Sequence, residues 1–110
     1  VLGHSRCGAV IATLEQLERP GETRSPNLAS IVDRIRPSVE ELLDTEVRHD
    51  QDALLERAIR ANVRSSVHQL RHGSEIIERL IETENLLVVG AEYSLETGRV
   101  DFFAGLADPA

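Results

Sequence analysis

The sequence predicts a helix-rich α/β chain. Several segments have apolar residues at helical spacing, whereas few have the character of strands. Residues 86–91 (LLVVGA) form a continuous apolar run, which is typical of a strand buried on both faces of an α/β sheet. Apolar residues make up 41% of the 110 residues, so one small core can form. Because the helices outnumber the strands that could cover them, we expect a partner, or more of the same domain, to complete the sheet.

The first twenty residues predict strand, turn and helix. Residues 1–3 (VLG) resemble the end of a buried strand, and helical spacing then extends over residues 8–19. A proline and a glycine at positions 20 and 21 end this helix. Residues 20–26 are expected to form a loop.

A second helical region begins at residue 27 and contains a proline. Pro37 is expected either to break this helix or to begin another at its first turn. Ser38 and Glu41 have the spacing of a capping box, so helix should continue through residue 43. The apolar positions on one face are Leu28, Ile31, Val32 and Ile35.

The second half of the chain predicts two helices and a hairpin. Residues 44–52 are polar and should connect to a long amphipathic helix over 50–72, which His72 and Gly73 end. A short helix is expected over 74–83. The strand at 86–91 should pair with a strand at 100–103 across a turn at 96–98, leaving residues 105–110 loose.

Charge and composition argue against several partners. The net charge is −7, all 12 basic residues are arginine, and none forms a dense basic cluster. Nucleic acid and anionic membranes are therefore not expected as main partners. No apolar run approaches the roughly 20 residues that span a bilayer, and no signal peptide is visible, so we expect a cytoplasmic protein.

The segment GHSRCG contains the residues best suited to chemistry. It lies where a strand ends and a helix begins, which is the edge of α/β sheets where ligands bind. A helix N-terminus favours a thiolate at Cys7, the form that binds metal, and His4 can turn towards the same point. Gly3 and Gly8 are expected to let the backbone bend and approach closely. The spacing alone is also compatible with a structural role, in which Cys7 is simply buried and His4 is hydrogen-bonded.

Four segments resemble the β-class carbonic anhydrases. Residues 1–10 (VLGHSRCGAV) are similar to the family's G-H-x-x-C-G zinc segment, and 62–70 to its N-V-x-x-x-V-x-x-L helix. Residues 89–100 (VGAEYSLETGRV) resemble its V-G-A-x-Y-D-x-x-T-G-x-V hairpin, and 25–39 the loop and helices after the zinc helix. The resemblance implies that residues 1–110 are the C-terminal part of one domain with a mostly parallel sheet, flanking helices and a C-terminal hairpin.

The resemblance also implies a function. His4 and Cys7 match two of the three constant Zn²⁺ ligands, and the reaction implied is reversible hydration of carbon dioxide to bicarbonate, a lyase activity. Gly8 and Tyr93 match positions near the substrate, although for Tyr93 a half-buried side chain at a strand end is the favoured interpretation. A homodimer or higher homo-oligomer is implied as well.

The family's upstream C-x-D-x-R segment, which supplies the other cysteine ligand and an Asp–Arg pair, has no counterpart in this sequence. Incomplete coverage of a longer protein is the preferred explanation. A non-catalytic truncated homologue that serves assembly or regulation is the alternative. A thiol switch at Cys7 ranks last, because it leaves the other motifs unexplained.

Overall fold

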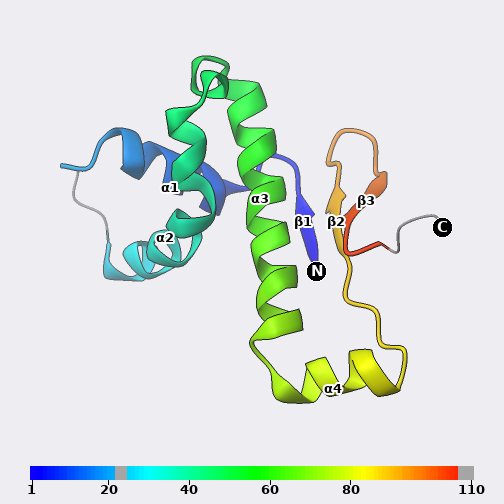
Figure 1. Cartoon of the computed structure of the whole chain (residues 1–110). Coiled ribbons are helices and arrows are strands. Elements are labelled where there is room, and N and C mark those ends of the chain that lie inside the picture. The colour runs from blue at the N-terminus through cyan, green and yellow to red at the C-terminus, as the bar shows by residue number, and fades with distance from the viewer. Residues whose placement is uncertain (22–24, 107–110) are drawn as a thin grey trace.

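The computed structural model describes residues 1–21 and 25–106, and most of its helices stand to one side of a small sheet (Figure 1). The α/β class is confirmed. The elements, in chain order, are β1 (Leu2–His4), α1 (Gly8–Glu18), α2 (Pro26–Val39), the 3-10 turns η1 (Glu40–Asp44) and η2 (Glu46–His49), α3 (Gln51–His72), α4 (Glu75–Thr83), β2 (Gly90–Tyr93) and β3 (Val100–Ala104).

Polar side chains at the helix starts explain where three helices begin. The Ser25 hydroxyl accepts a hydrogen bond from the Leu28 N–H at 3.2 Å, and Asp50 accepts one from the Ala53 N–H at 3.2 Å. Ser74 caps α4 in the same way. The predicted helices at 8–19, 50–72 and 74–83 are therefore confirmed to within a residue or two.

The main core lies between α1, α2 and α3, as Figure 1 shows. Apolar residues at helical spacing on each of these helices form the cluster, and Cys7 packs against it from the start of α1. This core fixes the direction in which α1 leaves the sheet. Its buried members are Val10, Leu14, Ile35, Val39, Leu54, Ala58 and Ile59.

The three strands form one mixed sheet in the order β1-β2-β3. β1 pairs with β2 in parallel, with His4 opposite Tyr93, and β2 pairs with β3 antiparallel. The predicted C-terminal hairpin is confirmed. Within the described residues, the β1–β2 pair is parallel, which is consistent with the long crossover through the helices between them.

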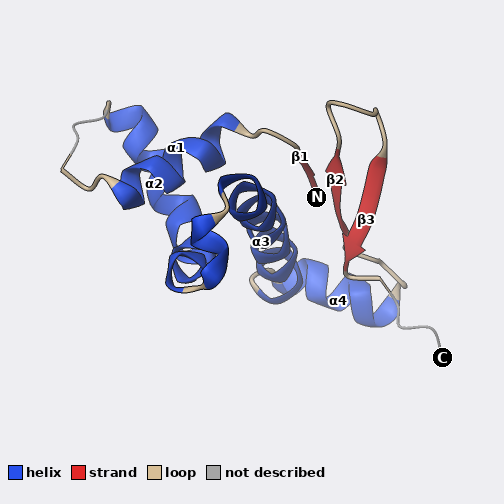
Figure 2. Cartoon of the chain, turned by 90° about the horizontal axis from the view of Figure 1, so that it is seen from above, coloured by secondary structure: helices blue, strands red, loops and turns tan. Residues whose placement is uncertain are grey.

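α3 packs closely against one face of the sheet (Figure 2). A Cβ added at Gly3 would lie 2.7 Å from a methyl carbon of Val63, and one added at Gly90 would lie 2.7 Å from the other methyl carbon. Glycine therefore lets β1 and β2 approach α3, which confirms the expected close approach at Gly3.

Successive side chains along a strand point to opposite faces of the sheet. Gly3 and Glu92 face α3, so the residues on either side of them in their strands point away from α3. We call this surface the bare sheet face. It is formed by Leu2, His4, Tyr93, Val100 and Phe102, whose hydrophobic members are between 36% and 63% exposed.

Three expectations about α2 and the residues that follow it were wrong in detail. α2 is not broken at Pro37, because the ring lies in the last turn and the helix ends two residues later at Val39. Ser38 consequently caps nothing, and residues 40–44 form a 3-10 turn because the α-helical ladder ends at Val39. Within the polar stretch 44–52, another 3-10 turn precedes α3.

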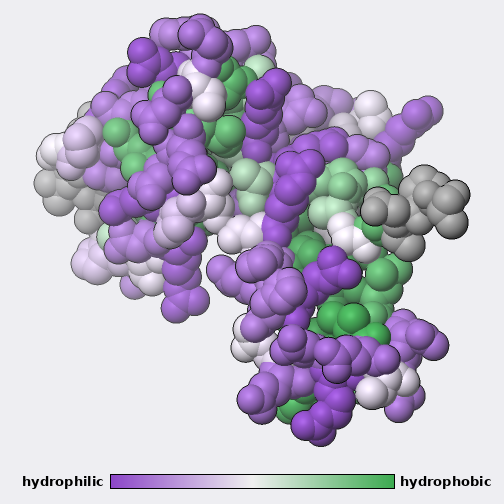
Figure 3. All heavy atoms as spheres, viewed as in Figure 1, coloured by the Kyte–Doolittle hydropathy of each residue, from purple (hydrophilic) through white to green (hydrophobic). Residues whose placement is uncertain are grey.

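The strand expected at 86–91 begins only at Gly90, and residues 86–89 are irregular. Leu86 and Leu87 are 39% and 56% exposed because no strand lies beside them here; the backbone of Val1 already lies against Val89 and Ala91. Residues 1–3 are not buried either, because β1 lies at the edge of the described sheet, and Leu2 is 63% exposed. Figure 3 shows the apolar surface that residues 86–89 contribute between the sheet and α4. In the tail, residues 107–110 lie outside the described residues, as do 22–24 in the predicted loop.

Candidate metal centre

A tight turn joins β1 to α1 and carries the two predicted ligands at its ends. His4 is the last residue of β1, and Cys7 is the N-cap of α1. The turn is made at Arg6, whose φ of 55° lies in the left-handed region and costs an L-residue on the order of 1 kcal/mol. The expectation that Gly8 provides the bend was wrong, because Gly8 already lies in the helix with a negative φ.

The His4 side chain is exposed on the bare sheet face. Its Nδ1 lies 2.8 Å from the carbonyl oxygen of Ser5. A carbonyl can only accept, so Nδ1 carries a proton, and in the neutral imidazole Nε2 then presents a lone pair. This is how a metal-binding histidine is usually held by its second ring nitrogen.

Cys7 is partly buried and is the single cysteine of the chain. Its side chain makes no capping hydrogen bond to α1, and its contacts are with the apolar core. The sulfur is therefore not committed to another polar partner.

The donor atoms fit part of a zinc site. Imidazole nitrogen and cysteine sulfur are the ligands that zinc prefers, and both come from one short turn. Over residues 1–21 and 25–106, however, no group of three or more His, Cys, Asp or Glu side chains could hold a metal ion. His4 and Cys7 thus supply two donors of a set that these residues do not complete.

Tyr93 and Gly8 lie on opposite sides of this turn. Tyr93 is 36% exposed and lies beside His4 across the β1–β2 pair. It lines a shallow hollow of about 340 Å³ together with Leu2, Gly3, His4 and Leu95. Gly8 is the first residue of α1 and has open space where a side chain would be.

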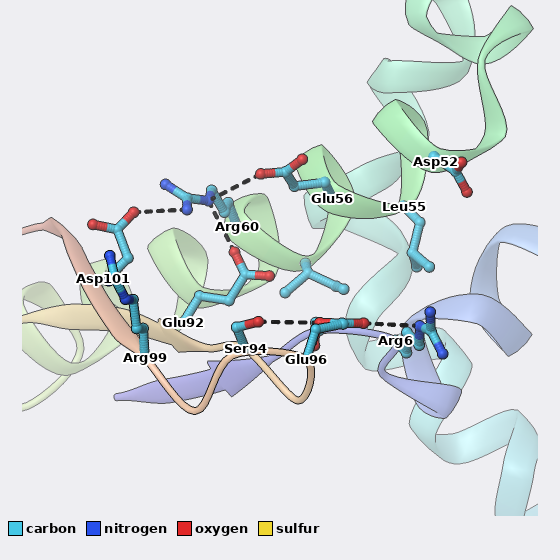
Figure 4. A pocket seen from close by; sticks show the side chains of 12 residues that line it. Arg6, Asp52, Leu55, Glu56, Arg60, Glu92, Ser94, Glu96, Arg99 and Asp101 are labelled. Carbon is cyan, nitrogen blue, oxygen red and sulfur yellow. Dashed lines mark hydrogen bonds and ion pairs between the residues drawn. The ribbon is translucent and has the colours of Figure 1, made fainter.

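A carboxylate from the hairpin turn binds the β1–α1 turn. Glu96 Oε2 accepts hydrogen bonds from the hydroxyl groups of Ser5 (3.1 Å) and Ser94 (3.0 Å). Glu96 Oε1 lies 3.0 Å from Nε of Arg6 (Figure 4). We call these four residues the Glu96 network. Hydrogen bonds from its own backbone N–H, Ser94 and Ser5 lower the pKa of the Glu96 carboxyl.

A second charged group joins α3 to both strands of the hairpin (Figure 4). Arg60 donates from Nε to Glu92 at 2.9 Å and from Nη2 to Asp101 at 2.7 Å. Its guanidinium also lies 4.6 Å from the ring centre of Phe103. The hydrogen bond to Asp101 is the main reason that the pKa of Arg60 is raised.

A cleft of about 450 Å³ separates the two charged groups, between α3 and the hairpin (Figure 4). Its lining residues are Ser5, Arg6, Asp52, Leu55, Glu56, Ile59, Arg60, Glu92, Ser94, Glu96, Arg99 and Asp101. Sequence reasoning missed Glu96 and Arg60 because no spacing in the sequence links them to residues as far away as Ser5 and Asp101.

Comparison with known proteins identifies the family. Residues 1–100 match the family model described as carbonic anhydrase, and the chain belongs to that family. A carbonic anhydrase from Mycolicibacterium smegmatis (strain ATCC 700084 / mc(2)155) is 35% identical over 108 residues, which cover 98% of this chain and 50% of the relative. The chain therefore spans about half the length of that relative.

Solved structures show the β-class fold. A tetrameric β-carbonic anhydrase from Sordaria macrospora superposes with a TM-score of 0.74 at 23% identity, covering 96% of this chain and 52% of that one. The β-carbonic anhydrase CcaA gives 0.72 at 24% identity, covering 98% and 51%. Within the described residues, no helix is both long and apolar enough to cross a bilayer.

Proposed function

We propose that this chain is the C-terminal part of a zinc-dependent carbonic anhydrase that hydrates carbon dioxide reversibly to bicarbonate. One observation carries the proposal: in a chain that matches the carbonic anhydrase family over residues 1–100, a thiol and an imidazole flank one tight turn. The remaining protein ligand is proposed to come from outside these 110 residues. A cytoplasmic location stays a prediction from the sequence.

The residues of the turn have separate roles in this proposal. His4 would bind zinc through Nε2, because Nδ1 is occupied by the Ser5 carbonyl, and Cys7 would bind as a thiolate. Zinc, when bound, supplies the means to activate a water molecule at neutral pH. Gly8 leaves room for substrate beside the helix N-terminus, where free N–H groups favour an anion such as bicarbonate. Tyr93 offers a hydroxyl group on the His4 side.

Association with further copies is part of the proposal. The bare sheet face exposes apolar side chains that an α/β sheet normally covers. The related protein from Sordaria macrospora is described as tetrameric. We propose that assembly, or the rest of the domain, covers this face.

The test uses the product of the complete coding region. Its zinc content and its rate of carbon dioxide hydration in a stopped-flow instrument are measured for wild type, His4→Ala and Cys7→Ser. We expect about one zinc per protomer and hydration well above buffer, with both reduced to background in the two variants. A C-x-D-x-R segment encoded upstream of Val1 would supply the ligand that is missing here.

A matched control addresses adventitious metal. His68 and His72 are exposed at i,i+4 on α3, with ring centres 4.5 Å apart, and such a pair can bind a divalent ion by itself. His68→Ala/His72→Ala should therefore leave hydration and the tightly bound zinc unchanged. Zinc-free wild type without hydration would refute the enzyme and favour the non-catalytic homologue.

A further inference from the structure

The Glu96 network links two segments about ninety residues apart in the sequence. Glu96 lies in the hairpin turn after β2, whereas Ser5 and Arg6 form the turn between β1 and α1. Its two carboxylate oxygens receive three contacts at 3.0–3.1 Å, two of them from the β1–α1 turn. Figure 4 shows Ser94, Glu96 and Arg6 in one line along the edge of the cleft.

Ser5 completes the connection between the two turns. Its hydroxyl accepts a hydrogen bond from the Leu95 N–H at 2.8 Å while donating to Glu96. Its backbone N–H donates to the Tyr93 carbonyl at 2.9 Å. The orientation of the Ser5 hydroxyl therefore depends on the Glu96 acceptor.

The β1–α1 turn needs such support because Arg6 adopts a left-handed conformation that L-residues disfavour. Local sequence does not supply the support, since Cys7 makes no capping hydrogen bond to α1. The carboxylate of Glu96 engages both residues that separate the two predicted ligands. A charged acceptor also strengthens these hydrogen bonds relative to neutral ones.

We propose that Glu96 is a positioning residue that holds Ser5 and Arg6 in the conformation that presents His4 and Cys7 to one metal ion. The proposal rests on the proposed zinc site. Glu96 does not touch the metal or the substrate in this account. Its effect passes through the turn alone.

The first arm of the test is independent of metal. Amide hydrogen exchange of Ser5 and Leu95, and the Arg6 chemical shifts that report left-handed backbone, are measured by NMR in metal-free protein. In Glu96→Ala the two amides should exchange about fivefold faster or more, and the Arg6 shifts should move away from left-handed values. Glu96→Gln keeps an oxygen acceptor but loses the charge opposite Arg6, so its effect should be smaller.

The second arm measures cobalt(II) binding through the sulfur-to-cobalt absorption band. Glu96→Ala should weaken cobalt binding by about tenfold or more, as is usual when a group that orients a ligand is removed, with Glu96→Gln intermediate. Thr97→Ala is the matched control. It alters the same hairpin turn, where Thr97 accepts from the Arg99 N–H, but leaves the Glu96 network intact.

The outcomes separate this proposal from the proposed function. The positioning role would be overturned if Glu96→Ala left the amide exchange rates and the Arg6 chemical shifts unchanged. It would also be overturned if Glu96→Ala loosened the turn but left the cobalt affinity unchanged. An equal effect of Thr97→Ala would overturn it too, because general loosening of the hairpin would then suffice. If the wild type binds no cobalt, the proposed zinc site is refuted, and the turn then has no metal ligands to present. The exchange data could in that case still show that Glu96 holds the turn.

Discussion

At the scale of single residues, glycine at two strand positions sets the distance between the sheet and α3. Gly3 and Gly90 both face the methyl groups of Val63 at distances that exclude a side chain. Gly8, by contrast, has open space and an ordinary helical backbone. These two kinds of glycine respond differently to the same substitution.

Gly3→Ala should lower the free energy of unfolding by about 1–3 kcal/mol, because its methyl group would clash with Val63 and β1 would have to shift. Gly8→Ala should raise it by about 0.4–1 kcal/mol, since alanine restricts the unfolded chain without a clash. Urea unfolding of both variants provides the comparison. Equal effects would show that the approach of β1 to α3 is looser than described.

Glu96 should make stability depend on acid pH. Its pKa is lowered in the folded chain by hydrogen bonds to its own N–H, Ser94 and Ser5. Its contribution is therefore present above the ordinary value of 4.5 and is lost as the pH falls below 4.5 through the folded value. The Tm difference between wild type and Glu96→Gln should be constant above about pH 5 and shrink below it. A constant difference down to about pH 3 would contradict this.

Sequence reasoning at this scale found the motif but not its support. The strand, turn and helix that carry His4 and Cys7 could be predicted because their signals are all local, whereas metal binding by these two residues stays a prediction. Glu96 could not, because a turn glutamate is ordinarily solvated and its partners lie at the other end of the chain. The left-handed Arg6 was missed because glycine, not arginine, is the usual residue in that conformation.

At the scale of elements, most of the helices could be predicted, whereas the irregular backbone of residues 86–89, just before β2, could not. Periodicity and N-caps are properties of adjacent residues, so α1, α3 and α4 followed from the sequence. A continuous apolar run becomes a strand only where neighbours pair with it along its length, and here the Val89 carbonyl accepts a hydrogen bond from the Val1 amino group while residues 86–89 form no ladder. Pro37 was misjudged because the helix continues for two residues past the ring and ends at Val39, so the proline lies in the last turn of α2 and does not divide it.

Arg60 determines how firmly α3 is joined to the hairpin. Arg60→Leu would leave the buried Glu92 carboxylate without its cation and should lower the free energy of unfolding by about 2 kcal/mol. Arg57→Leu is the matched control, because Arg57 is exposed on the same helix and should change stability by about 0.5 kcal/mol or less. Urea unfolding measures both, and equal losses would deny Arg60 this role.

At the scale of the whole molecule, α1, α2 and α3 lie on one side of the sheet (Figure 2). Exposed apolar side chains lie on the other, the bare sheet face. Large exposed apolar surfaces of this kind mark interfaces. The sequence predicted this imbalance from the ratio of helices to strands, whereas the residues of the bare sheet face emerge only from the strand register.

Phe102→Asp should therefore weaken self-association, since Phe102 is 55% exposed on the bare sheet face. Ile31→Asp provides the control, because Ile31 is 45% exposed on α2, away from the sheet. Sedimentation velocity should show wild type and Ile31→Asp as assemblies and Phe102→Asp as a smaller species, with equal helical circular dichroism. Wild type sedimenting as a 12.2 kDa monomer would contradict association of this chain by itself.

The proposed zinc site requires that His4 and Cys7 bind the same zinc ion. X-ray absorption at the zinc edge, recorded on the zinc-loaded product of the complete coding region, tests it most directly. If both residues bind, the spectrum should show sulfur at about 2.3 Å and imidazole nitrogen at about 2.0–2.1 Å, with the sulfur signal reduced in Cys7→Ser and the imidazole signal reduced in His4→Ala. A shell of oxygen and nitrogen alone, unchanged by either substitution, would contradict it.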